Sequence, residues 1–191
     1  MSVFSSAHRQ KRSASTVSTD SAATTAPITL SERSSMGLAL IRIFVGYLWL
    51  QQLSWKLPPD FKGLHSYVVR EGLYTIVPGY SYVIQHIFLP NFIILGACVW
   101  TAELLASLCL IFGIFTRFGA LLTVLLATQL YLGLAFAPGE WYWTYGMLIL
   151  LGLVLASVPA GRRLGFDQFI APRLQARARS NRFVRVLSWL A

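Results

Sequence analysis

The sequence predicts an all-α integral membrane protein. We expect a four-transmembrane-helix bundle, a short extracytoplasmic interfacial helix and a basic amphipathic C-terminal helix. Four apolar runs, at about 36–57, 90–115, 118–137 and 142–159, reach or approach the ~20 residues that cross a bilayer. Only 12% of the 191 residues are charged, whereas soluble domains carry about a quarter. Lipid is therefore the expected solvent, and one membrane domain uses nearly all the apolar residues, so no second soluble domain is expected.

The positive charges predict the orientation of the four spans. They gather before the first run, between the second and third, and after the fourth: Arg9, Lys11, Arg12, Arg33, Arg117, Arg162, Arg163, Arg173, Arg177, Arg179, Arg182 and Arg185. The other two connections are nearly balanced or acidic. Because cytoplasmic loops carry the excess of Lys and Arg, we expect both termini in the cytoplasm of a multi-pass plasma-membrane protein.

Composition divides the chain into three parts. Residues 1–33 are rich in Ser, Thr and Ala without apolar periodicity, which predicts a disordered cytoplasmic tail. Residues 34–168 form the predicted four-helix membrane domain. Residues 169–191 form a basic amphipathic cytoplasmic tail, in which a helix over 172–190 would place its arginines against an anionic inner leaflet.

The first span carries both of its cations on one face. At ~100° per residue, a narrow arc holds Arg42, Gly46, Trp49, Leu53 and Lys56. Such a stripe should face other helices rather than lipid. Pro58 and Pro59 end this helix, and an outer loop follows from Asp60 to Leu89. Within the loop, the aromatic stretch 74–88 predicts the short interfacial helix.

Glu103 interrupts the second apolar run and is the most informative residue. A carboxylate in hydrocarbon costs several kcal/mol, so it should face the bundle interior and have a partner. We expect that partner to be Arg42, with a depth gap of ~10 Å that two extended side chains could span. Two hypotheses follow: the pair only locks two helices together, or it also acts on a bound ligand or a proton.

Polar and aromatic residues cluster at the outer ends of the spans: Gln51, Gln52, Trp55, Lys56, His86, Asn91, Gln129 and Tyr145. A cavity with apolar walls and a few donors and acceptors would suit a quinone head group or a small anion. The alternative is interfacial anchoring, because Trp, Tyr and Lys gather at membrane surfaces. Gln51 and Gln52 are harder to explain as anchors.

Other classes of site lack a signal. No two histidines face each other on the predicted spans, so haem held by two histidines of this chain is not expected. Cys98 and Cys109 lie in one predicted helix, ~16 Å apart, too far for a disulfide. The sequence has no CxxC motif, metal-ligand cluster or glycine-rich phosphate loop. The basic residues flank membrane spans, so nucleic acid is not the expected partner.

Four segments resemble the DoxX/DoxD family of small four-helix membrane proteins: RIFVGYLWLQQLSWKLPPDF (42–61), ELLASLCLIFGIFTRFGALL (103–122), PGEWYWTYGMLIL (138–150) and GRRLGFD (161–167). The WK pair at 55–56 and the spacing of Glu103 and Arg117 are the most telling features. The likeness covers about 36–168. The DoxD-like branch is the small subunit of thiosulfate:quinone oxidoreductase, so the resemblance implies oxidation of thiosulfate to tetrathionate with electrons passed to quinone.

Two functions follow from the resemblance. In the first, the chain is an oxidoreductase subunit with Glu103 and Arg42 as catalytic residues. Thiosulfate would approach Lys56 and Arg70, and quinone, the acceptor, would lie beside Trp55, Glu103 and Tyr145. Gln52, His86 and Gln129 complete the expected binding site, with no metal and no covalent cofactor. In the second, the chain is a non-catalytic membrane partner that anchors or assembles another redox protein. Expected partners are lipid, a second oxidoreductase subunit and further copies of the chain.

Overall fold

The structure, a computed structural model, describes residues 32–177 and 182–191, and within them every regular element is helical. The predicted tail 1–33 lies almost entirely outside the described residues. Four long helices form the body: α1 (Glu32–Gln52), α4 (Phe92–Phe112), α5 (Thr116–Leu134) and α6 (Tyr142–Ser157). Each overlaps one of the predicted apolar runs. The stretches Ser34–Trp55, Tyr80–Phe112 and Thr116–Leu134 are long and apolar enough to cross a membrane, whereas Tyr142–Ser157 is a shorter apolar helix.

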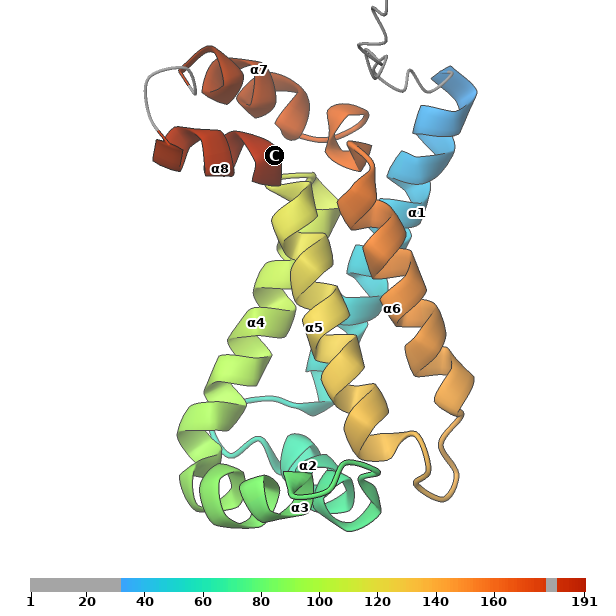
Figure 1. Ribbon diagram of the computed structural model, residues 1–191, viewed down its shortest axis with the longest axis vertical. Coiled ribbons are helices and arrows are strands. Elements are labelled where there is room, and N and C mark those ends of the chain that lie inside the picture. Colours follow the sequence, from blue (N-terminus) through green and yellow to red (C-terminus); the bar gives the residue numbers. More distant parts are fainter. Residues whose placement is uncertain (1–31, 178–181) are drawn as a thin grey trace, which may run out of the picture.

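The long helices pack with α5 between α4 and α6, and with α1 against α4. Figure 1 shows that the start of α1 and the C-terminus lie at the same end of the body. Small residues allow the close approach: a Cβ added at Gly46 would lie 2.9 Å from Ile111 on α4. Gly113, with φ of 64°, ends α4 in the left-handed conformation that glycine tolerates best.

The end opposite the termini holds more helix than predicted. The loop expected from Asp60 to Leu89 contains α2 (Lys62–Tyr74), which lies across this end, and α3 (Tyr80–Val83). The prediction of a loop over 62–74 was therefore wrong. The short helix expected within 74–88 is present as α3, but it continues through η2 (Ile84–Phe88) and η3 (Leu89–Asn91) into α4. The missed signal was Leu64, Tyr67 and Val68, an apolar spacing typical of an amphipathic helix.

The end of the body that holds the start of α1 is closed by the C-terminal segment. After η4 (Ala160–Arg162), the chain forms two further helices, α7 (Asp167–Arg177) and α8 (Arg182–Leu190). The remaining short element, η1 (Leu53–Trp55), directly follows α1. The single helix expected over 172–190 is therefore two helices, with residues 178–181 outside the described part. Buried Asp167 accepts hydrogen bonds from the backbone N–H groups of Phe115 (2.8 Å) and Thr116 (2.9 Å). This capping satisfies the first N–H groups of α5 and explains the acidic end of the segment 161–167.

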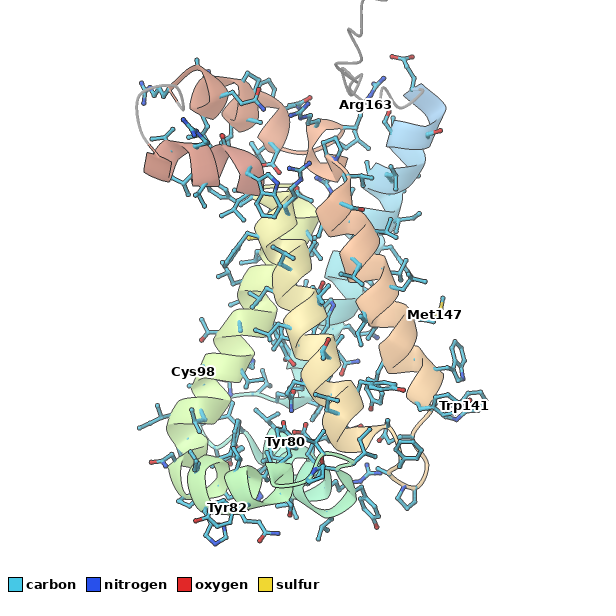
Figure 2. The ribbon with its side chains drawn as sticks, in the orientation of Figure 1. Tyr80, Tyr82, Cys98, Trp141, Met147 and Arg163 are labelled. Carbon is cyan, nitrogen blue, oxygen red and sulfur yellow. The ribbon has the colours of Figure 1, made fainter. Side chains whose placement is uncertain are left out.

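Large apolar side chains cover the outside of the bundle. Phe44, Ile94, Leu125 and Leu150, one from each long helix, are 61%, 69%, 66% and 55% exposed. Cys98, Trp141 and Met147 also point outward in Figure 2. Scattered apolar residues are normal on a soluble surface, but an apolar covering on every long helix is not. This surface is compatible with a lipid environment.

Candidate functional site

A cavity of about 420 Å³ lies between the long helices and α2. Its lining residues come from α1, α2, α4, α5 and α6, from η1 and η2, and from the connection between α5 and α6. Most of the wall is apolar or aromatic, and the polar groups are few. Those polar lining residues are Gln52, Lys56, Tyr67, Glu71, Glu103, Gln129, Glu140, Thr144 and Tyr145. Helices distant in the sequence therefore place several ionisable groups around one cavity.

A buried ion pair forms one wall of the cavity. Lys56 Nζ lies 2.5 Å from Glu103 Oε1, and the two side chains are only 4% and 2% exposed. Lys56 follows the 3-10 turn at the end of α1, whereas Glu103 lies in the middle of α4. The second carboxylate oxygen of Glu103 is also buried, but it has no hydrogen-bond partner among the described residues. The carboxylate thus uses only one of its two oxygens in a hydrogen bond to the described residues.

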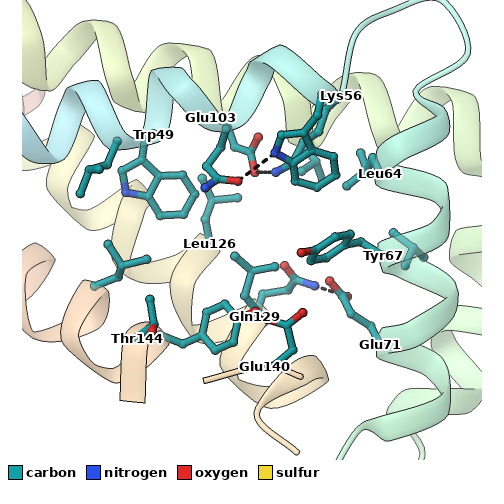
Figure 3. A pocket seen from close by; sticks show the side chains of 18 of the residues that line it. Trp49, Lys56, Leu64, Tyr67, Glu71, Glu103, Leu126, Gln129, Glu140 and Thr144 are labelled. Atoms are coloured by element: carbon teal, nitrogen blue, oxygen red, sulfur yellow. Dashed lines mark hydrogen bonds and ion pairs between the residues drawn. The ribbon is translucent and has the colours of Figure 1, made fainter. Parts of the chain in front are cut away.

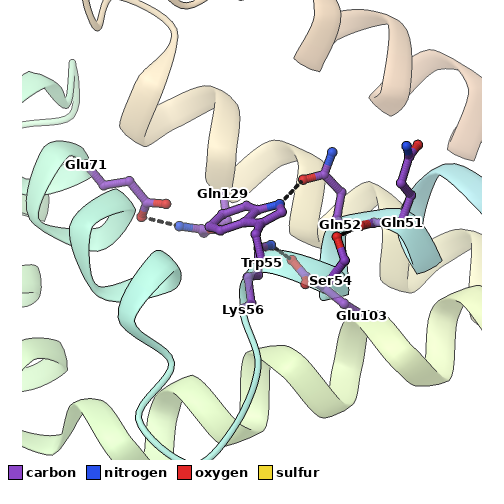
Figure 4. A network of polar contacts seen from close by, with 8 residues as sticks. All are labelled: Gln51, Gln52, Ser54, Trp55, Lys56, Glu71, Glu103 and Gln129. Carbon is purple, nitrogen blue, oxygen red and sulfur yellow. Dashed lines mark hydrogen bonds and ion pairs between the residues drawn. The ribbon is translucent and has the colours of Figure 1, made fainter.

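Aromatic rings lie beside this ion pair. The ammonium of Lys56 lies 4.7 Å from the centre of the Trp55 ring. That ring contacts Tyr67 of α2, with 4.8 Å between the ring centres. The Trp55 indole N–H donates to Gln52 Oε1 at 3.0 Å, as drawn in Figure 4. These contacts hold the Trp55 and Tyr67 rings next to the charged pair, where a flat ligand could stack.

A second carboxyl group, that of Glu71, faces the ion pair from α2. It accepts a hydrogen bond from the side-chain amide of Gln129 on α5, and that amide also donates to the Tyr80 hydroxyl at 3.1 Å. Figure 3 shows the Tyr67 hydroxyl between Glu71 and the Lys56–Glu103 pair. Burial raises the pKa of Glu71 to about 8, although the bond from Gln129 lowers it. Glu71 is therefore mostly protonated at neutral pH.

A third carboxyl group joins the cavity to its outer rim. Glu140 accepts hydrogen bonds from the Tyr145 hydroxyl at 2.7 Å and from Arg70 at 3.1 Å. Arg70 also donates to the backbone carbonyl of Pro138 at 2.9 Å. These contacts attach α2 to the connection between α5 and α6. Arg70 does not line the cavity but neutralises the lining residue Glu140.

The structure brings together six of the nine predicted site residues: Gln52, Trp55, Lys56, Glu103, Gln129 and Tyr145 all line the cavity. His86 does not, because its ring is exposed and stacks on Tyr82, with 4.1 Å between the ring centres. Arg70 acts only through Glu140. Sequence reasoning missed Glu71 and Tyr67, since both lie on the unpredicted helix α2, and Glu140, which lies in a connection.

The predicted pairing of Arg42 with Glu103 was wrong. Arg42 is fully buried, but its guanidinium donates to the Leu164 carbonyl at 2.8 Å, far from the cavity. The physical reason is helix register. Because α1 and α4 run antiparallel and Gly46 lies level with Ile111, Arg42 lies level with Gly113. That position is ten residues, or ~15 Å, beyond Glu103 along α4.

Among the described residues, no group of three or more His, Cys, Asp or Glu side chains is arranged to hold a metal ion. Comparisons of the chain with protein-family models, curated proteins and solved structures each found no match. The resemblance to the DoxX/DoxD family therefore stays a prediction from the sequence segments given above.

Proposed function

We propose that this chain is a four-span membrane protein that binds a quinone-type ring in the cavity, as the membrane subunit of a quinone-linked oxidoreductase. Within the described part of the chain, three helices are long and apolar enough to span a bilayer, and α6, at ~24 Å, would make the fourth with its aromatic N-terminal end at the interface. Both termini would be cytoplasmic and α2 extracytoplasmic. The basic segments support this orientation in the plasma membrane.

The observation that carries the ligand proposal is the cavity with the Lys56–Glu103 pair on one wall and Glu71 on the other. Reducing a quinone consumes two electrons and two protons. Buried carboxyl groups beside the ring are suitable proton carriers. Glu71 can supply a proton at neutral pH because it is mostly protonated there. Trp55 and Tyr67 would contact the ring.

The charge balance favours an uncharged ligand over an anion. Lys56 is paired with Glu103, and Arg70 is paired with Glu140. Neither cation is left to bind an anion with two negative charges, and either carboxylate would repel it. In this proposal thiosulfate, the donor implied by the family resemblance, would react on a partner subunit and electrons would reach the quinone here.

The test is saturable binding of a decyl-substituted benzoquinone to the purified protein in lipid nanodiscs, followed by quenching of tryptophan fluorescence. Thr144→Trp should block the cavity and abolish binding, because Thr144 lines it. The matched control is Thr101→Trp, at an exposed position on α4 that does not line the cavity. Absence of saturable binding to the unmodified chain would refute the proposed ligand.

Activity is measured separately, as thiosulfate-dependent quinone reduction by membranes with and without this chain. A loss of reduction that only the complete chain restores supports the oxidoreductase subunit. Quinone binding without any effect on reduction would instead favour the alternative, a membrane partner that positions another redox protein.

A further inference from the structure

The cavity reaches the surface of the bundle on one side. Among the described residues, five line the cavity and are also exposed, two from the end of α1 and η1 and three from the start of α6 and the connection before it: Gln52, Trp55, Gly139, Trp141 and Thr144. The two tryptophans, Trp55 and Trp141, are 36% and 64% exposed. Residues that both line a cavity and are exposed mark the place where it opens. The mouth of the cavity, defined by these five residues, therefore lies between the end of α1 and the start of α6.

The packing of the long helices explains why the cavity opens here. The interfaces of α1 with α4, α4 with α5, and α5 with α6 are closed where glycines let the backbones approach. A Cβ added at these glycines would lie 2.9, 2.6 and 2.7 Å from the neighbouring helix, at Gly46 against Ile111, at Gly119 against Cys109 and at Gly152 against Val124. By contrast, α1 and α6 pack much less closely. Figure 1 shows that these two helices diverge toward α2.

The end of the bundle that α2 covers is a poorer way out of the cavity. Arg70 fastens α2 to the connection between α5 and α6, because it donates to Glu140 at 3.1 Å and to the Pro138 carbonyl at 2.9 Å. At the end of α2, the Thr75 hydroxyl donates to the Leu132 carbonyl of α5 at 3.1 Å. A ligand leaving in this direction would have to pass these contacts and the charged groups that make them. The opening between α1 and α6 is not crossed by them.

Apolar side chains lead from the cavity to the outer surface of the bundle. Leu48 of α1 and Leu148 of α6 both line the cavity and are partly buried. Phe44 lies one turn before Leu48 on the same face of α1 and is 61% exposed. Figure 3 shows Trp49 of α1 and Thr144 of α6 on opposite sides of the cavity. A chain of methylene groups that left the cavity between α1 and α6 would stay in apolar surroundings, so it would not lose the free energy gained by avoiding water.

We propose that the ligand enters the cavity from the bilayer, between α1 and α6, and that it carries an apolar tail which leaves through the mouth past Leu48 and Leu148. This inference rests on the proposed function and specifies the ligand as a membrane quinone with an alkyl or prenyl chain, rather than a water-soluble ring. With about 420 Å³, the cavity holds a substituted ring but not a long chain as well. The exposed rings of Trp141, Tyr142 and Trp143 place the mouth near the membrane interface on the side of α2.

The experiment maps the tail of the bound ligand by photolabelling. The probe is a decyl-substituted benzoquinone with a diazirine on a chain carbon close to the ring, added to the purified protein in lipid nanodiscs. After illumination, mass spectrometry identifies the labelled peptides. We expect the label that excess unlabelled decyl-benzoquinone removes to be concentrated on α1 and α6, near Leu48 and Leu148. Removable label concentrated on α2 or any other element, or none despite saturable binding, would overturn this inference and leave the proposed function intact. Absence of saturable binding would refute both.

A chemical bridge across the mouth provides a second readout. Gln52→Cys with Thr144→Cys, in a Cys98→Ala background, is treated with bis-maleimides of increasing length, and mass spectrometry confirms the bridge. The bridge should stop the binding of added quinone and also stop the release of quinone bound beforehand, whereas damage to the fold would release the bound quinone.

The matched control places the same bridge across the closed interface of α1 with α4. Leu50→Cys with Leu108→Cys suits this purpose, because both residues are exposed and neither lines the cavity. This bridge should leave quinone exchange unchanged. Exchange that continues through a confirmed bridge between positions 52 and 144 would contradict the lateral route, and the photolabelling of the unmodified chain decides the question if that bridge does not form.

Discussion

The Lys56–Glu103 ion pair should show strong energetic coupling. The two groups lie 2.5 Å apart and are 4% and 2% exposed, so neither is well solvated. Lys56→Met leaves a buried carboxylate without its cation, which should lower the free energy of unfolding by about 3–5 kcal/mol. Glu103→Leu leaves the ammonium without its anion and should cost a similar amount. The double variant leaves no buried charge, so it should cost less than either single variant, which corresponds to a coupling energy of more than about 3 kcal/mol.

Unfolding can be followed by labelling a cysteine thiol at increasing concentrations of a denaturing detergent. Cys109 is buried and Cys98 exposed, so a Cys98→Ala background leaves one reporter that reacts only when the bundle opens. The control is a second double variant, which combines Arg42→Met with Glu103→Leu. The losses in free energy of unfolding from these two changes should add within about 0.5 kcal/mol, because the two side chains make no contact. Additive effects of Lys56→Met and Glu103→Leu, or coupling of Arg42 with Glu103, would refute the assigned pairing.

Three further predictions concern α2, its packing and the orientation of the chain. Because folding raises the pKa of Glu71 from 4.5 to about 8, stability should be full below pH ~5 and fall as pH rises through 8. Glu71→Gln should flatten this dependence of the unfolding midpoint, and an equally steep profile in that variant would exclude Glu71 as its source. Gly133→Ala should destabilise the protein by about 1–3 kcal/mol, because the added Cβ would lie 2.8 Å from Glu71 Cγ, whereas Gly146→Ala meets nothing within 4 Å and should not. Equal unfolding midpoints for these two variants would contradict the packing of α2 on α5. A reporter enzyme fused after Ala191 should be active only in the cytoplasm, and activity only outside the cell would reverse the proposed orientation.

Much of the candidate site could be predicted because its signals are local. Glu103 is a carboxylate within an apolar run, and such a residue must face the protein interior whatever the arrangement of the other helices. Gln52, Trp55 and Lys56 lie within five residues of one another at the end of one helix, so they stay close together in any fold that keeps this helix. Glu71 gave no such signal, because a carboxylate in a loop of mixed charge is ordinary. It became part of the site only when α2 packed across the end of the bundle.

The sequence by itself determined where the long helices lie, since hydropathy is a property of a continuous segment and each segment can satisfy its own backbone hydrogen bonds. It also determined that Arg42 and Glu103 would face the bundle interior, whereas Lys56 was expected at the outer end of its span. The tertiary structure decided which of them pair. The close approach of α1 and α4 at Gly46 places Lys56 at Glu103 and Arg42 at the Leu164 carbonyl. One chain segment carries no information about its register against another, because register depends on contacts between surfaces that meet only after the helices pack.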